Sequence, residues 1–498
     1  MADFDLAIVG GGINGTGIAR DAAGRGLRVL LVEQDDLASG TSSASTKLVH
    51  GGLRYLEHGW FRLVREALVE REVMLRMAPH LIRPMRFVLP SAQGLRSPWL
   101  LRLGLFIYDH LGGRKILPPT RTVDLANDPL GAPLKRRHGP GYEYSDCWAD
   151  DSRLVVLNAL DAAERGAVIR TRTRCIGAER GDVWRLVLDA RGRRDAASAR
   201  VLINATGPWL QLFAETVLRQ EAPSHVRLVK GSHIVVRRLF EHDHGYIFQT
   251  GDGRVVFALP FAGDFTLIGT TDQSFVGDPS GVKPSADEIA YLCDVSNGYF
   301  REQIGAADVV WSFAGVRSLY DDGSMKAQDT TRDYFLDLDA RNGEAPLLNI
   351  YGGKITTYRR LAEQALEHLA HVLGMGPAWT KDSHLPGGEF PHNGIEALIA
   401  KTRRSWPFLA EPHAARLVHA YGTRIARVLG PARHPDELGP WLGADLTAAE
   451  VRYLMDREWA QAADDLLWRR SKLGLRFSPK DRQRLAKFMS DRTGSTAD

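Results

Sequence analysis

Residues 6–15 read LAIVGGGING, an apolar run that leads directly into a glycine-rich turn. After this turn apolar residues recur at helical spacing, and a second apolar run, residues 27–32, ends at Glu33. The pattern predicts a strand, a tight turn, a helix and a second strand. Such a turn can approach a pyrophosphate at the helix N-terminus, and Glu33 can accept hydrogen bonds from ribose hydroxyls. The stretch therefore predicts a dinucleotide site; the alternative is a purely structural βαβ unit with a solvated Glu33.

Three later segments indicate which dinucleotide is bound. A hydroxyl-rich loop at residues 39–52 follows the second strand, residues 201–207 form an apolar strand that ends in a tight turn, and residues 347–358 repeat the order strand, glycine pair, helix. A buried flavin needs contacts along its whole length, whereas a diffusing nicotinamide cofactor needs one half-site. The segments therefore favour a flavin, whose reduced anion would be stabilised by the second helix N-terminus, with Lys354 beside it. The alternative for residues 39–52 is a solvated surface loop.

The composition excludes several other classes of protein. The chain has 498 residues, and a net charge of +4 is too small for this length to favour a nucleic-acid partner. Its three cysteines are far apart and form neither a disulfide framework nor a CxxC pair, and we expect no metal site. Residues 1–9 lack the basic start of a signal peptide, and no apolar run reaches the roughly 20 residues of a membrane span. We therefore expect a cytoplasmic chain.

The rest of the chain divides at a cluster of proline and glycine. Before it, residues 231–236, 254–259 and 265–272 have the composition of strands and predict an antiparallel sheet on the substrate side. Residues 386–394 contain the breaker cluster and predict a linker. Helical periodicity dominates after the linker, and the polar residues 491–498 predict a disordered tail.

Longer motifs extend over essentially the whole chain. They are TSSASTKLVHGGLRYLE (residues 41–57), YSDCW (144–148), NATGPW (204–209), KGSHIVV (230–236), TRDY (331–334), GGKITTYR (352–359) and AADDLLWRR (462–470). Through these motifs the chain resembles the family of FAD-dependent, respiratory glycerol-3-phosphate dehydrogenases. No calcium loop of the form D-x-[DN]-x-[DN]-G is present, so the chain resembles the shorter bacterial form.

The resemblance implies an α/β fold with an additional helical part. A Rossmann-like FAD-binding domain and an antiparallel β substrate domain would be interleaved within residues 1–390, as in flavoproteins of glucose-oxidase and amino-acid-oxidase architecture. Residues 391–498 would form an all-α C-terminal cap domain that ends in the disordered tail.

The resemblance also implies a reaction and its cofactor. sn-Glycerol 3-phosphate would be oxidised to dihydroxyacetone phosphate by hydride transfer from C2 to flavin N5, and the electrons would pass to ubiquinone or menaquinone. We expect a homodimer bound peripherally to the cytoplasmic face of a bacterial inner membrane. The residues assigned to FAD are Gly10, Gly12, Asn14, Gly15, Glu33, Thr41, Ser42, Ser45, Lys47, Leu48, His50, Gly52, Thr206, Gly207, Gly353, Lys354, Thr356 and Thr357.

The substrate has a dianionic phosphate and a secondary alcohol, so its site needs cations at one end and a proton acceptor near the other. The resemblance assigns substrate contacts to Arg54, Tyr55, Thr270, Arg317, Arg332 and Lys354. Without it, any single arginine would be interpreted as a solvated surface charge.

Candidate catalytic residues are His233, Arg317 and Lys354. The pKa of histidine suits proton transfer near neutral pH, which makes His233 the candidate base. Two alternatives stay open: His233 only orients a neighbour, or an arginine held against the alkoxide lets the proton leave through water.

Quinone reduction needs contact with lipid without a membrane span. In residues 83–115 basic side chains alternate with large apolar ones, which predicts either membrane-surface contact or an ordinary packed helix. Trp459, Trp468, Arg469, Arg470 and Lys472 leave the same two alternatives.

Three other functions remain as alternatives. An amine or 2-hydroxy-acid oxidase of the same architecture would need one arginine to hold a carboxylate, whereas several cations favour a phosphate. A flavin-binding redox sensor or electron carrier would have no use for Lys354 beside paired arginines. An NAD-dependent dehydrogenase is opposed by the loop at residues 41–52 and by the second glycine-pair helix.

Overall fold

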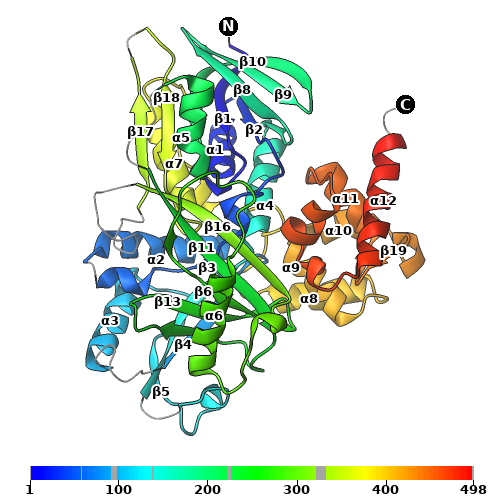
Figure 1. Ribbon diagram of the computed structural model, residues 1–498. Helices are drawn as coiled ribbons and strands as arrows, with labels where there is room; N and C mark the ends of the chain where they lie inside the picture. The colour runs from blue at the N-terminus through cyan, green and yellow to red at the C-terminus, as the bar shows by residue number, and fades with distance from the viewer. Residues whose placement is uncertain are drawn as a thin grey trace.

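The glycine-rich turn belongs to the first of two sheets, in the upper half of Figure 1. The computed structural model describes residues 2–57, 59–90, 98–136, 140–220, 226–320, 333–341 and 343–495. The order of strands in the first sheet is β17 (Phe335–Asp339), β18 (Leu347–Tyr351), β10 (Arg193–Asn204), β1 (Phe4–Val9), β2 (Val29–Val32) and β7 (Val168–Arg170). From β18 to β7 neighbouring strands are parallel, so their carboxyl ends meet at one edge. β9 (Trp184–Ala190) pairs antiparallel with β10, and β8 (Arg174–Arg180) with β9.

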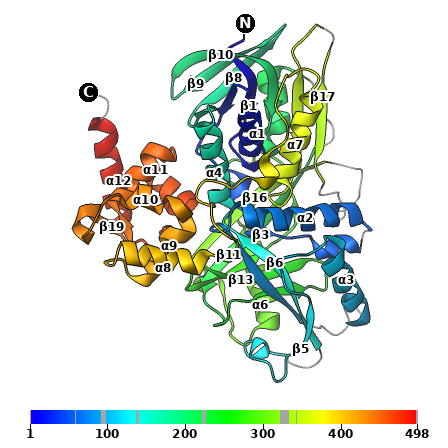
Figure 2. The same cartoon turned by 180° about the vertical axis from the view of Figure 1, so that it is seen from behind.

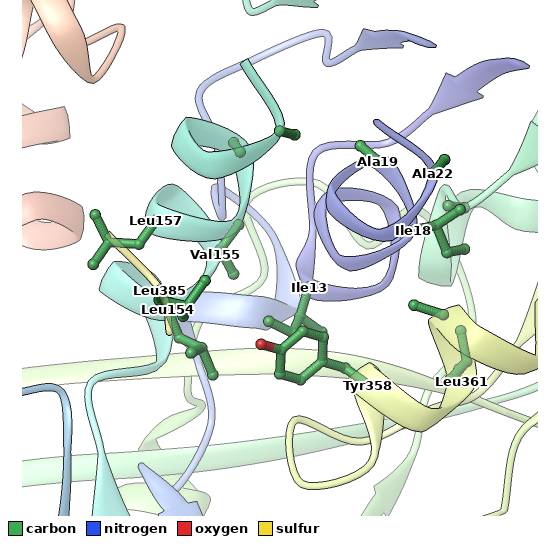
Figure 3. Close-up of a cluster of buried hydrophobic side chains, with 14 of the residues drawn as sticks. Ile13, Ile18, Ala19, Ala22, Leu154, Val155, Leu157, Tyr358, Leu361 and Leu385 are labelled. Carbon is green, nitrogen blue, oxygen red and sulfur yellow. The ribbon is translucent and has the colours of Figure 1, made fainter. Parts of the chain in front are cut away.

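Helix α1 (Ile13–Gly24) packs between α4 (Asp151–Glu164) and α7 (Tyr358–Leu369) on this sheet. Figure 3 shows the apolar side chains that these three helices turn toward one another, among them Ile18 and Leu361. Small residues on α1 make the approach close, because a Cβ at Gly17 would lie 2.6 Å from the Tyr358 ring. Each large apolar side chain buried here stabilises the fold by about 1.5–3 kcal/mol, so the packing holds the turn before α1 in place.

The second sheet lies below the first in both views of the molecule (Figures 1 and 2). Its strands are, in order, β15 (Gln273–Ser274), β11 (Val226–Arg237), β14 (Phe265–Gly269), β13 (Val255–Phe261), β12 (Gly245–Gln249), β4 (Ile82–Pro90), β6 (Pro140–Ala149) and β3 (Leu48–Val49), while β16 (Trp311–Tyr320) pairs with β11 and β5 (Arg121–Asp124) with β6. Apart from the parallel pair β4 and β12, all of these neighbours are antiparallel. The two sheets alternate along the chain, which confirms the interleaved α/β architecture predicted above.

Three longer helices surround the second sheet: α2 (Phe61–Met77), α3 (Pro98–Leu111) and α6 (Ala286–Tyr299). The interpretation of residues 83–115 as one packed helix is wrong, because their first part is strand β4 and, among the residues of this range that the structure describes, the helix covers residues 98–111 alone. The alternation of basic and apolar residues up to Pro90 comes from β4, whose successive side chains point to opposite faces of the sheet.

The C-terminal part of the chain has its own hydrophobic cluster, formed by residues between Ile399 and Met489. Its helices are α8 (Ile395–Ser405), α9 (Glu411–Tyr421), α10 (Ile425–Leu429), α11 (Ala448–Arg457) and α12 (Pro479–Ser495). A short ribbon of β19 (Trp441–Gly443) and β20 (Leu446–Thr447) adds strands that the all-α expectation lacked. Helix α12 continues through residues 491–495, where a disordered tail was expected; residues 496–498 lie outside the described ranges. No helix in those ranges is both long and apolar enough to cross a membrane.

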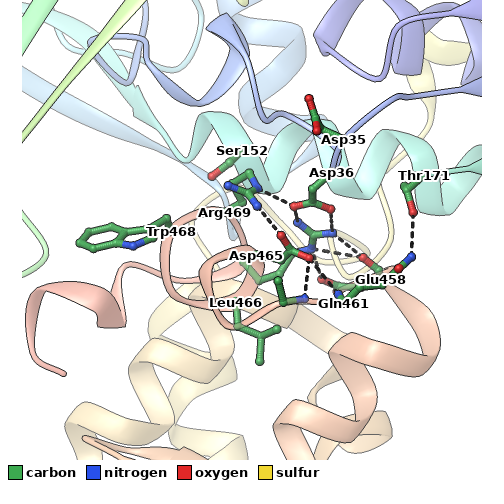
Figure 4. A network of polar contacts seen from close by, with 12 residues as sticks. Asp35, Asp36, Ser152, Thr171, Glu458, Gln461, Asp465, Leu466, Trp468 and Arg469 are labelled. Carbon is green, nitrogen blue, oxygen red and sulfur yellow. Dashed lines mark hydrogen bonds and ion pairs between the residues drawn. The ribbon is translucent and has the colours of Figure 1, made fainter. Parts of the chain in front are cut away.

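Buried ion pairs join this C-terminal part to the first sheet (Figure 4). Arg470 donates to both oxygens of Asp36 at 2.6 and 2.7 Å, and neither side chain is exposed. Arg469 also donates to Asp36, at 2.5 Å. On the same interface Arg153 pairs with Glu458 with almost no exposure of either side chain. Because each of these charges has lost its water, each depends on its partner.

We predict that Arg470→Ala lowers the free energy of unfolding by about 3–5 kcal/mol, because it leaves Asp36 buried with part of its charge uncompensated. Denaturant unfolding of the purified protein measures the change. Arg403→Ala is the matched control, since Arg403 pairs with Glu411 at 2.7 Å with 48% and 68% of the side chains exposed, and should cost at most about 1 kcal/mol. Equal losses in the two variants would contradict a stabilising role for the buried network.

Candidate active site

One cavity of about 360 Å³ lies at the carboxyl edge of the first sheet and reaches the second. The glycine-rich turn, the hydroxyl-rich loop, the turn after β10 and the glycine pair after β18 all line it. Strands β11 and β16 close its other side with residues that include His233 and Arg317. Segments that are hundreds of residues apart in sequence therefore meet in a single space, as the parallel strand order requires.

Glycine is required at two positions of the first turn. Gly10 has φ +117°, and a Cβ there would overlap the carbonyl of Ala205; a Cβ at Gly15 would overlap the carbonyl of Gly10. At the start of α1, the backbone N–H of Ile13 donates to Ser42 Oγ at 3.0 Å. The turn is thus an open backbone cradle at a helix N-terminus, a geometry suited to a pyrophosphate.

Glu33 directly follows β2 and lines the same cavity. Its carboxylate accepts from the backbone N–H of Gly11 at 2.7 Å and of Asp35 at 2.8 Å. Burial raises the pKa of Glu33 to about 7, against the effect of those two donors. Glu33 therefore fixes the turn as well as facing the ligand space.

Lys47 occupies an unexpected place. Its side chain is fully buried and does not line the cavity; Nζ donates to Asp151 at 2.6 Å and to the Ser43 carbonyl at 2.7 Å. Burial lowers the pKa of Lys47, and the facing Asp151 charge opposes this. Lys47 thus holds the hydroxyl-rich loop from behind. Three other residues assigned to the cofactor, Gly15, Gly52 and Thr357, also lie outside the cavity lining.

The substrate-side candidates gather at the end of the cavity formed by the second sheet. Tyr55, Thr270, Arg317, Lys354 and His233 line it. Arg317 donates to Asp272 at 2.8 Å, and Lys354 Nζ lies 4.1 Å from the centre of the Tyr55 ring. Arg54 does not line the cavity, and Arg332 falls outside the described residues.

His233 is buried in this lining. Its Nε2 lies 3.0 Å from Thr46 Oγ1. Burial, together with the charges of Lys47 and Arg317, holds the pKa of His233 well below its usual range. The ring is therefore neutral near pH 7, and its surroundings disfavour a lasting imidazolium. Within the described ranges, His, Cys, Asp and Glu side chains form no cluster suited to a metal ion.

Sequence reasoning missed one wall of the cavity. Trp209, Leu212, Phe213, Thr216 and Val217 line it from the segment that follows β10, which includes the short helix α5 (Leu210–Phe213). These residues are spaced three and four positions apart, which is helical spacing, and this pattern could have predicted a helix with one face on the cavity. Thr173, Arg174 and Cys175 add lining from the start of β8.

Comparison with known proteins agrees with this geometry. The model of a family described as FAD dependent oxidoreductase matches residues 5–359, and that of the C-terminal domain of alpha-glycerophosphate oxidase matches residues 378–494. A glycerol-3-phosphate dehydrogenase of Pseudomonas aeruginosa is 52% identical over 98% of this chain and 95% of its own length. The chain belongs to the FAD-dependent glycerol-3-phosphate dehydrogenase family.

Other relatives show the breadth of this family. The aerobic glycerol-3-phosphate dehydrogenase of Escherichia coli is 48% identical, covering 99% of this chain and 98% of its own. A D-erythritol 1-phosphate dehydrogenase of Brucella abortus is 49% identical, covering 96% of both chains. The crystal structure of the Bacillus halodurans glycerol-3-phosphate dehydrogenase complexed with FAD matches with a TM-score of 0.77 at 25% identity, covering 99% of this chain and 91% of that one.

The cavity fits the family's FAD. Gly10 and Gly12 line the cavity beside the N-terminus of α1, where a Cβ would overlap the Ala205 carbonyl at Gly10 and lie 3.1 Å from Ser42 Oγ at Gly12. Asn14 lines the cavity, and among the described residues no donor reaches its buried Oδ1. The chain is therefore an FAD-dependent oxidoreductase, and the segments found from sequence line the cavity in which the cofactor would be held.

We predict that Gly10→Ala abolishes most FAD binding, because the new Cβ overlaps the Ala205 carbonyl and φ +117° disfavours alanine. The ratio of flavin to protein absorbance after purification measures this. Gly26→Ala is the control: Gly26 also has a positive φ, +86°, but a Cβ there meets nothing within 4 Å. FAD lost equally from both variants would mean that backbone strain, not the cradle, is responsible.

Proposed function

We propose that this chain oxidises sn-glycerol 3-phosphate to dihydroxyacetone phosphate and passes the electrons to a membrane quinone. The observation that carries the proposal is the meeting of Arg317, Lys354 and the neutral His233 at one end of the FAD cavity. Two cations suit a dianionic phosphate ester, and a neutral imidazole suits the proton of its alcohol. The names of the relatives from Pseudomonas aeruginosa and Escherichia coli support the same substrate.

The cations would bind and orient the substrate. Arg317 donates to Asp272 and lines the cavity, so its guanidinium is held where the phosphate of the substrate would bind. Lys354 is kept over the Tyr55 ring, so its charge is in place before the substrate arrives. Holding both cations in advance lowers the conformational cost of binding a phosphate.

His233 would take the hydroxyl proton as the carbonyl forms at C2. Its Nε2 is within hydrogen-bond distance of Thr46, so a substrate hydroxyl could replace or share that contact. Bound FAD supplies the acceptor, at N5, for the hydride that leaves C2. Loss of one proton and one hydride from the alcohol balances the oxidation to a ketone.

The test is anaerobic titration of the purified flavoprotein with glycerol 3-phosphate. We expect the oxidised flavin band to bleach and to return when a quinone is added. D-Erythritol 1-phosphate should be titrated in parallel, because the Brucella abortus relative carries that substrate in its name. Bleaching by the erythritol ester alone would overturn the substrate we propose, and bleaching by neither would overturn the reaction.

In the same titration, Arg317→Ala should raise the glycerol 3-phosphate concentration at half-reduction by about 10–150-fold, the effect of losing a charged hydrogen bond worth roughly 1.5–3 kcal/mol, while FAD stays bound. Arg254→Ala is the control, since Arg254 pairs with Asp252 at 3.3 Å and does not line the cavity. Unchanged titration of Arg317→Ala would remove Arg317 from the substrate site.

Helix α3 is the surface we propose for contact with the membrane. Trp99, Leu100, Leu103 and Phe106 on it are 69%, 48%, 45% and 59% exposed, and their spacing places them along one side of the helix. The C-terminal candidates are engaged elsewhere, because Arg470 is buried on Asp36 and Trp468 stacks on Trp311. We also propose, from the family resemblance, a homodimer on the cytoplasmic face of the inner membrane.

We predict that replacing Trp99 and Phe106 together by serine reduces co-sedimentation with vesicles of anionic phospholipid at least several-fold, because burial of aromatic side chains in the interface is lost. Quinone reduction should fall in parallel, whereas reduction of a water-soluble dye should not. Trp441→Ser is the control, as Trp441 is 42% exposed on the C-terminal part. Undiminished vesicle binding would exclude α3 as the membrane surface.

A further inference from the structure

A column of aromatic rings runs from the C-terminal part of the chain into the active-site cavity. Trp468 stacks on Trp311 with ring centres 4.5 Å apart and an angle of 23° between planes. Trp311 packs on Phe313 at 4.6 Å, and Phe313 stacks on His233 at 4.9 Å and 12°. Because the Trp311 and Phe313 planes are tilted by 37°, the rings form a column of successive contacts, and the imidazole of His233 is its last ring.

Strand register explains the inner half of the column. Trp311 and Phe313 are two residues apart on β16, so their side chains lie on the same face of the sheet. Phe313 is directly opposite His233 on the neighbouring strand β11. Lys47 Nζ lies 4.7 Å from the centre of the Phe313 ring. Phe313 is therefore confined between a buried cation, the imidazole and Trp311.

The outer end of the column is built by the C-terminal part. Trp468 belongs to the π-helix η10 (Asp465–Arg470), and in Figure 4 its ring points away from the ion pairs of Asp36. A Cβ at Gly474 would lie 2.6 Å from this ring, and the Arg482 guanidinium lies 5.3 Å from its centre. Lys472 Nζ donates to the Trp468 carbonyl at 2.6 Å. The position of the ring is therefore restrained by Gly474 and Arg482 as well as by Trp311.

The orientation of His233 depends on this stack more than on hydrogen bonds. A histidine ring is usually fixed by a hydrogen bond at the nitrogen that does not react. In the part of the chain that the structure describes, the buried Nδ1 of His233 has no such partner, and the ring's one hydrogen bond joins Nε2 to Thr46. Because Nε2 lies close to the axis of the Cβ–Cγ bond, rotation about this bond moves Nε2 little, so the contact with Thr46 restrains the ring plane weakly, whereas stacking on Phe313 sets that plane.

We propose that Trp468 is a positioning residue for His233: by stacking on Trp311 it presses the aromatic column into the cavity and holds the imidazole plane for proton transfer. The proposal rests on the role of His233 in the function proposed above. It means that the C-terminal part, which contributes no side chain to the cavity lining within the described residues, takes part in the reaction through this column.

The experiment compares holoenzymes of Trp468→Leu, Trp468→Phe and the wild type. With Trp468→Leu we expect native FAD content, a first-order rate of flavin reduction at saturating glycerol 3-phosphate about 5–20-fold lower, and a substrate dissociation constant changed by less than about 2-fold. The pH dependence of that rate should shift, because the environment of the imidazole changes. Trp468→Phe keeps a ring in the stack and should recover most of the rate.

Trp441→Leu is the matched control, a tryptophan of the same part of the chain that contacts His413 and lies outside the column. It should behave as the wild type. Trp311→Leu and the double variant Trp311→Leu/Trp468→Leu complete a double-mutant cycle. The fold-loss of rate in the double variant should be much smaller than the product of the two single losses, because both substitutions break the same column.

A crystal structure of the Trp468→Leu holoenzyme supplies a readout that does not depend on substrate. We expect the rings of Phe313 and His233 to be rotated or displaced from their stacked positions. Unmoved rings, or a rate and pH profile equal to those of the wild type, would overturn the proposal; so would equal rate losses in Trp468→Leu and Trp468→Phe.

Two further results would change how the experiment is interpreted: a variant that does not fold, and a substrate that does not reduce the wild-type flavin. If Trp468→Leu does not fold, Trp468→Met, which fills much of the same volume without a ring, takes its place in the comparison with Trp468→Phe, and wild-type kinetics with unmoved rings in Trp468→Met would overturn the proposal. If glycerol 3-phosphate fails to reduce the wild-type flavin, the proposed function is wrong, while the crystal structure of the variant still tells whether Trp468 holds His233.

Discussion

The close approach of two strand ends is the constraint on which the rest of the site depends. Gly10 at the end of β1 lies so near the Ala205 carbonyl after β10 that no side chain fits between them. Buried Asn204, just before, donates to Asn349 Oδ1 of β18 at 3.0 Å. Three strand ends from distant parts of the chain are thereby held at one edge. Because helix α1 begins at this edge, its N-terminal donors face the same space, and the cofactor cavity follows from the arrangement.

The local patterns of the sequence predicted most of this arrangement. The glycine spacing before α1, the apolar run before residue 205 and the glycine pair after β18 each encode a strand and a turn, and parallel strands bring such turns together. Contacts between distant residues were not predictable in the same way. The burial of Lys47 on Asp151 and the pairing of Asp36 with Arg470 join residues that are far apart in sequence. No local sequence pattern predicts such contacts. Strand β4 was mistaken for part of a helix because a short apolar run fits either period.

The cations of the cavity share one physical property: each is restrained before a ligand arrives. Arg317 is held by Asp272, and Lys354 by the face of Tyr55. Lys47, although it does not reach the cavity, keeps the loop that supplies Ser42 and Ser45 to the lining. Prearranged charge of this kind need not reorganise as the substrate reacts, which is the main electrostatic advantage of an enclosed site over water.

The interleaving of the two sheets has a consequence for biosynthesis. Strand β1 is the first to leave the ribosome, yet its neighbour β10 begins at Arg193, and β18 and α7 follow only after residue 346. Until β10 has been made, the edge of β1 is unpaired, and until β18 has been made, the edge of β10 is unpaired. Unpaired strand edges are surfaces on which chains aggregate. FAD can be captured only after roughly three quarters of the chain has been made.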